Sequence, residues 1–124
     1  MHQAANAYAR VSQASLSPRE LEATALMKAA MRLQAVRDDW ASRRGELSGA
    51  LDFNQKLWTI LATAATDDAG ALPSDIRQGV SDLAGFVFNH TFAIIAEPDA
   101  AKLGPLVNIN RELAAGLRGT PMAA

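Results

Sequence analysis

The chain has 124 residues, with 12 basic residues, 13 acidic residues, no cysteine and a formal net charge of −1. This length suits a single domain with one modest core, and the lack of cysteine excludes disulfides and thiolate metal sites. The near-neutral charge gives no general attraction to nucleic acid or to an anionic membrane. Abundant alanine and few β-branched residues favour helix throughout.

Residues 3–13 are predicted to form a short helix with a thin apolar face that includes Tyr8. A helix this short is marginal alone and should be ordered only by docking on the rest of the domain. The N-terminus has no apolar signal-peptide core, and no apolar run approaches the ~20 residues that a membrane span needs. We therefore expect a cytoplasmic protein that does not contact a membrane.

The clearest local signal lies at residues 16–21. Ser17 suits the N-cap, Pro18 suits the first helical position, and Glu20 stands three residues after the cap, which is the spacing of a capping box. Leu16 and Leu21 occupy the two positions of a hydrophobic staple. A helix should therefore begin here, and Gly45 should end it after about residue 44.

Two faces of this predicted helix carry apolar side chains. The main stripe predicts a core face that ends at Trp40, because its members recur at helical spacing. Met27 and Met31 lie one turn apart on a different face. Methionine is adaptable and is common at surfaces that bind partner proteins.

The next helix should begin near residues 46–49 and run to about residue 66. Trp58 lies in its core stripe, and Asn54 lies within the same stripe. Phe53 and Ile60 flank the stripe on the side away from Trp58. A buried asparagine must be hydrogen-bonded, so Asn54 is expected to bond a neighbouring helix or, alternatively, a bound peptide.

Residues 73–97 are predicted to form the central helix, around which the rest of the chain wraps. Its second half is apolar around most of its circumference, which requires neighbours on several sides. One stripe is the core face; Phe88, Phe92 and Ile95 belong to a second stripe. His90 lies at the edge of the core stripe, and we expect it to be partly buried and bonded to a neighbour.

The last helix should run from about residue 103 to residue 118, where Gly119 stops it. Asn110 lies on its buried face, with the same two interpretations as Asn54. All connections are short, so consecutive long helices should pack antiparallel. The predicted fold is all-α, an antiparallel bundle of four long helices plus a short N-terminal helix. Residues 1–124 form one domain, with 1–2 and 119–124 as loose ends.

No enzyme signature is found. His90 has neither a paired histidine nor a nucleophile nearby in sequence, and adjacent carboxylates in a helix point about 100° apart. No Gly-rich phosphate loop is present. We therefore expect no catalytic residues, no metal and no cofactor. Acidic residues dilute the basic ones on residues 19–44, so nucleic-acid binding is not favoured.

The chain carries more large apolar side chains than a bundle this small needs. The surplus side chains are predicted to form a groove for an amphipathic partner helix: Met27, Met31, Phe53, Ile60, Phe88, Phe92 and Ile95. The alternative is that the N-terminal helix or simple core packing covers them.

Several collinear segments resemble the FlaF family of alphaproteobacterial flagellar regulators: SPRELEATALMKAAMRLQAVRDDW, LDFNQKLWTILATAA, LPSDIRQGVSDLAGFVFNHT and LVNINRELAAGLRG, with AYARV before them. The similarity covers residues 7–119 and keeps both tryptophans. It departs in the loops at 42–49 and 67–71 and in the tail. No catalytic residues are carried over, because the resemblance implies none.

The resemblance implies a cytoplasmic regulator that binds flagellin as a chaperone for secretion and assembly and works alongside an FlbT-like partner. Flagellin's terminal segments are disordered before assembly and become amphipathic helices, which suits a helical groove. One alternative is a post-transcriptional regulator that contacts RNA directly or through the FlbT-like protein. A second alternative is a homodimeric structural module. The sequence leaves the oligomeric state open.

Overall fold

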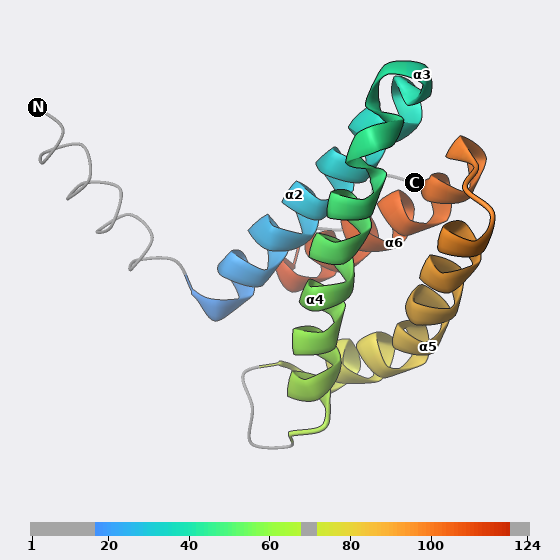
Figure 1. The fold of residues 1–124 in the computed structure, drawn as a ribbon. Helices are drawn as coiled ribbons and strands as arrows, with labels where there is room; N and C mark the ends of the chain where they lie inside the picture. The colour runs from blue at the N-terminus through green and yellow to red at the C-terminus, as the bar shows by residue number, and fades with distance from the viewer. Residues whose placement is uncertain (1–16, 68–71, 120–124) are drawn as a thin grey trace, which may run out of the picture.

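The computed structural model describes residues 17–67 and 72–119. Four long helices dominate this part of the chain: α2 (Pro18–Asp38), α4 (Leu47–Ala65), α5 (Ser74–Ala96) and α6 (Leu103–Leu117). Three short elements connect them: α3 (Trp40–Arg43), η1 (Arg44–Glu46) and η2 (Ala100–Lys102). The described residues contain no strand, which confirms the all-helical prediction (Figure 1). The predicted helix at 3–13 and Leu16 of the staple lie outside the described residues.

The start of α2 confirms the predicted N-cap. Ser17 has extended backbone angles, its Oγ accepts a hydrogen bond from the Glu20 backbone N–H at 3.2 Å, and Pro18 takes the first helical position. The Glu20 carboxylate accepts a hydrogen bond from Arg118 Nε at 3.2 Å. Glu20 therefore ties the start of α2 to the end of α6.

The prediction of one uninterrupted helix to residue 44 is wrong, because the helix breaks at Asp39. The backbone there adopts φ −133° and ψ 53°, and α3 and η1 follow as separate short turns. Aspartate is a weak helix former because its side chain competes for backbone hydrogen bonds. Trp40 still packs partly buried against the core, and the Arg44 guanidinium lies 5.5 Å over its ring.

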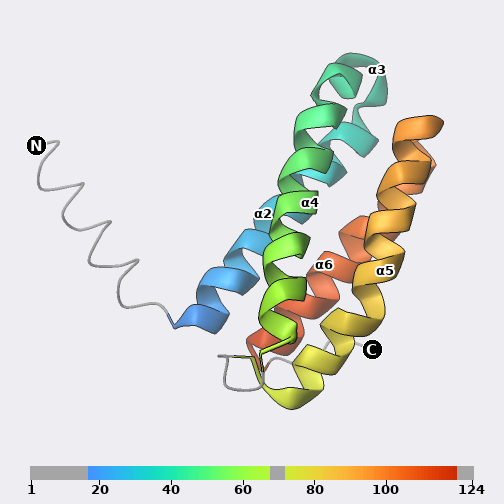
Figure 2. The same ribbon diagram turned by 60° about the horizontal axis from the view of Figure 1, so that its bottom comes forward.

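Helices α2, α4, α5 and α6 all contribute side chains to the core, with the most extensive helix contacts between α2 and α6 and then between α4 and α5 (Figures 1 and 2). The α2 face turned to the core carries Ala23, Ala29 and Ala30, all fully buried. Small side chains allow neighbouring backbones to approach closely. Arg118 contacts Glu20 near one end of α2, and Gly104 lies against Arg37 near the other, so α2 and α6 run in opposite directions.

Helix α5 occupies the range predicted for a central helix but stands at the edge of the group in both views (Figures 1 and 2). It packs on α4 and, less extensively, on α6. One stripe, which includes Val80, Val87 and Ile94, is buried as predicted. The prediction that its second half is surrounded is wrong, since Phe86, Phe92 and Ile95 are 45%, 59% and 56% exposed.

Helix α5 also corrects the expectation about apolar runs. Among the described residues it alone is long and apolar enough to cross a membrane by length and composition, with a mean hydropathy of 1.2 over 18 residues. One such helix is weak evidence for a membrane span, because helices of soluble proteins pass the same test. Only 28% of this 18-residue segment of α5 is buried inside the fold, so much of its surface faces outward.

Candidate binding surfaces

The two buried asparagines join α4 to α6 within the core. Asn110 donates from Nδ2 to Asn54 Oδ1 at 2.7 Å and accepts at Oδ1 from Trp58 Nε1 at 2.9 Å. All three side chains are fully buried. This confirms the expectation that Asn54 and Asn110 satisfy neighbouring helices, because they bond one another across the helix interface. Asn54 Nδ2 has no hydrogen-bond partner among the described residues.

His90 behaves as a structural residue. Its Nε2 lies 2.7 Å from the Lys102 carbonyl oxygen, so the ring donates a hydrogen bond to the connection before α6. The Phe86 ring stacks on it with centroids 5.0 Å apart. His90 is partly buried and bonded to a neighbour, as predicted. The described residues contain no cluster of three or more His, Asp or Glu side chains able to hold a metal ion.

The seven side chains predicted to form one docking groove lie on several different surfaces. Met27 and Met31 line a groove on α2, and Ile95 lines another between α4 and α5. Ile60 is 65% exposed on α4, and Phe92 is exposed on α5. Phe53 and Phe88 are half-buried against the core.

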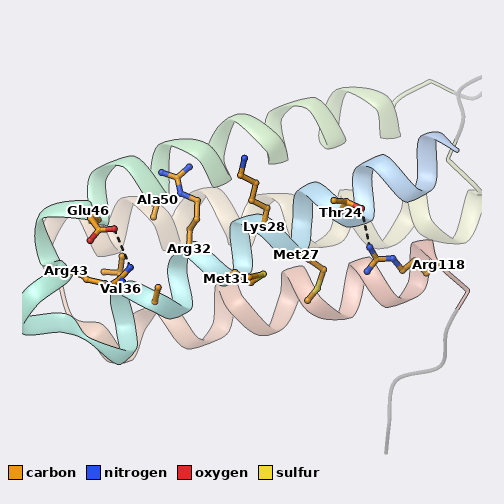
Figure 3. Close-up of a pocket in the computed structure, with 11 residues that line it drawn as sticks. Thr24, Met27, Lys28, Met31, Arg32, Val36, Arg43, Glu46, Ala50 and Arg118 are labelled. Carbon is orange, nitrogen blue, oxygen red and sulfur yellow. Dashed lines mark hydrogen bonds and ion pairs between the residues drawn. The ribbon is translucent and has the colours of Figure 1, made fainter. Parts of the chain in front are cut away.

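The groove on α2 has a volume of about 580 Å³ and follows the outer face of the helix. Figure 3 shows that Met27 and Met31 extend to the α6 side of α2, while Lys28 and Arg32 extend towards α4. Met31 is 63% exposed. The remaining lining residues come from both ends of the groove and from α4: Thr24, Ala35, Val36, Arg43, Glu46, Ala50 and Arg118.

The cations of this groove differ in their partners. Arg43 lies 3.7 Å from the Glu46 carboxylate and 3.8 Å from that of Asp39, and Arg118 pairs with Glu20. Lys28 and Arg32 have no carboxylate partner among the described residues; both instead lie over the Phe53 ring, at 5.5 and 5.0 Å from its centroid. Phe53 thus holds two unpaired cations beside the methionine pair through cation–π contacts.

A second groove, of about 410 Å³, lies between the start of α4 and the end of α5. Ile95 and Pro98 form its α5 side, and Leu47 and Leu51 form its floor on α4. Polar residues of both signs complete the lining: Arg44, Ser48, Asp52 and Gln55. This lining thus carries one cation, Arg44, and one carboxylate, Asp52, and the Asp52 carboxylate pairs with Lys56 at 3.0 Å.

Sequence reasoning missed the two features that distinguish these surfaces. Lys28 and Arg32 stand one turn apart, as Met27 and Met31 do, so the two i,i+4 pairs run side by side along one helix. That spacing was visible in the sequence. The sequence did not show that no carboxylate faces these two cations, because it did not show which helix would pack beside them. Phe86 was also missed as an exposed aromatic side chain.

These observations define a small helical protein that offers apolar and cationic helix faces at its surface. The chain matches the family model described as "Flagellar protein FlaF" over residues 4–117, and it therefore belongs to the FlaF family of flagellar proteins. No curated protein and no solved structure matches it. The match covers α2, α4, α5 and α6 in full.

Proposed function

We propose that this flagellar protein is a cytoplasmic, non-enzymatic chaperone that binds an amphipathic helical segment of flagellin. The observation that supports this proposal is the set of large apolar side chains left outside the core: Leu21, Met31, Ile60, Phe86, Phe92 and Ile95. Two of them, Met31 and Ile95, line the two grooves described above, which a helix could enter. Apolar helix faces of this kind bind amphipathic partner helices.

The energetics suit a chaperone that must release its client. A flagellin segment that is disordered before assembly pays an ordering cost when it binds as a helix. Each buried apolar side chain returns about 1.5–3 kcal/mol, so two or three contacts leave a moderate net affinity. Such a complex shields the segment from premature association and still dissociates on export.

Titration of labelled flagellin with the full-length protein tests this proposal. We expect saturable binding at micromolar concentrations, and absence of binding in that range to flagellin or to any of its terminal segments would refute the proposal. Met31→Asp tests the α2 groove and Phe92→Asp tests the α5 face, and circular dichroism checks that each variant keeps its helicity. At least one variant should weaken binding, because each removes apolar surface from one of the two exposed faces.

The homodimer alternative predicts that the exposed faces cover one another. Sedimentation velocity over a hundredfold range of protein concentration distinguishes the homodimer from the chaperone proposal. If the protein dimerises, its sedimentation coefficient should increase as concentration rises. Under the chaperone proposal, the sedimentation coefficient of the free protein should stay constant and change only when flagellin is added.

A further inference from the structure

We infer that the α2 groove is the docking site and that it accepts a helix whose apolar stripe is flanked by carboxylates spaced i,i+4. This inference rests on the proposed function, because it specifies the segment that the chaperone would bind. The groove combines the exposed Met31 and the half-buried Met27 with two cations that lack carboxylate partners among the described residues.

The charges of the groove favour an acidic partner. Among the exposed cations of the described residues, Arg43, Lys56 and Arg118 have a carboxylate nearby. Lys28 and Arg32 have none, and Phe53 holds both of their charged groups on the same side of α2. Side chains four residues apart on a helix stand about 5–6 Å apart, so a facing helix with Asp or Glu at i and i+4 can meet both cations at once.

The shape of the groove favours a short helix. Thr24 and Val36 bound its α2 portion, a separation of twelve residues or about 18 Å of helix. That length matches roughly three turns of a partner helix. Apolar side chains of the partner would lie on Met27 and Met31, and its carboxylates would turn towards α4, where Figure 3 places Lys28 and Arg32. The one-sided charge therefore sets the rotation of the bound helix.

The other candidates for this groove fit its chemistry less well. Residues 1–16 contain no Asp or Glu and include Arg10, so the chain's own N-terminal segment cannot neutralise the two cations. A second copy docked groove to groove would bring like charges together. Single-stranded RNA binding relies on stacking aromatics, and the lining of this groove includes none.

Fluorescence anisotropy with two helical peptides tests the inference on the full-length protein. Both peptides carry leucines at helical spacing, one with Glu and one with Lys at the flanking i,i+4 positions. We expect the Glu peptide to bind at least tenfold more tightly, and its affinity to fall as salt rises. The double variant Lys28→Glu/Arg32→Glu should reverse this preference. The control Arg19→Glu/Lys56→Glu makes the same change in net charge at exposed sites outside the groove and should preserve the preference.

The same variants with flagellin separate this inference from the proposed function. Loss of at least tenfold in flagellin affinity in Lys28→Glu/Arg32→Glu, but not in the control, supports both. Unchanged affinity in that variant overturns the groove assignment and leaves the chaperone proposal standing. Tight Glu-peptide binding without any flagellin binding supports the groove chemistry and refutes flagellin as client. Binding of the flagellin leader RNA that is lost in the groove variant would overturn the inference.

Discussion

The inner face of α2 and the outer face of α5 use apolar side chains in opposite ways. Helix α2 has a charged outer face and an alanine-rich inner face, and the side chains of the inner face are fully buried. Helix α5 is the most membrane-like helix of the described chain by composition, yet most of its apolar window lies outside the core. Apolar content therefore did not decide which helix became central. The alanines on the inner face of α2 allow close approach of a neighbouring helix, and the most extensive helix contact is the one between α2 and α6.

The largest contrast should come from aromatic truncation in the two regions. Trp58→Ala removes a fully buried ring and leaves Asn110 Oδ1 without its donor, so we expect a loss of about 3–5 kcal/mol in the free energy of unfolding. The matched variant Phe92→Ala on the exposed α5 face should cost less than about 1 kcal/mol. Urea denaturation followed by circular dichroism measures both. Equal losses would mean that the α5 face is part of the core.

A pair of asparagine substitutions isolates the polar contribution. Asn110→Ala leaves Trp58 Nε1 and Asn54 Oδ1 unpaired inside the core, and we expect it to lower the free energy of unfolding by about 2–4 kcal/mol. Asn89→Ala, at an exposed position of α5, should change it by no more than about 0.5 kcal/mol. A small effect of Asn110→Ala would show that the hydrogen-bonded trio contributes little to stability.

Helix starts provide a weaker contrast. Ser17→Ala removes the only side-chain cap of α2, which should cost about 1 kcal/mol. Helix α5 begins after Pro73 without a side-chain cap, so Ser74→Ala should have an effect within about 0.5 kcal/mol. Thermal denaturation at fixed pH compares the two, and similar shifts in Tm would argue against the capping role of Ser17.

The smallest effect concerns a carboxylate at the edge of the core. Burial raises the pKa of Glu22 above its ordinary value of 4.5, and its Oε2 has no hydrogen-bond partner among the described residues. The folded state therefore holds this proton more tightly than the unfolded chain, so Glu22 lowers stability as pH rises from 4.5 through the raised pKa. Glu22→Gln should remove that decline. Parallel unfolding curves for both proteins between pH 4 and pH 7 would contradict this prediction.

Local signals in the sequence were sufficient for the starts of the long helices and for their buried stripes, but not for the break at Asp39. The N-cap at Ser17, the positions of Leu47, Trp58 and Leu61, and the stop near Gly119 follow from capping chemistry and helical spacing, and all appear in the structure. The sequence indicated that Asn54 and Asn110 would each need a hydrogen-bond partner in the core. Which atoms would meet could not, because that depends on how two helices far apart in the sequence are aligned.

Tertiary structure alone decided which helix stands at the edge and which cations remain unpaired. A helical pattern shows that a face is apolar but not whether a neighbour reaches it, since that depends on how closely the backbones of other helices approach. Phe92 stays exposed because α5 has neighbours on one side only, and Lys28 and Arg32 stay unpaired because α4 presents Phe53 to them instead of a carboxylate. The sequence thus determined the faces of each helix, and helix packing determined which of those faces are open to a partner.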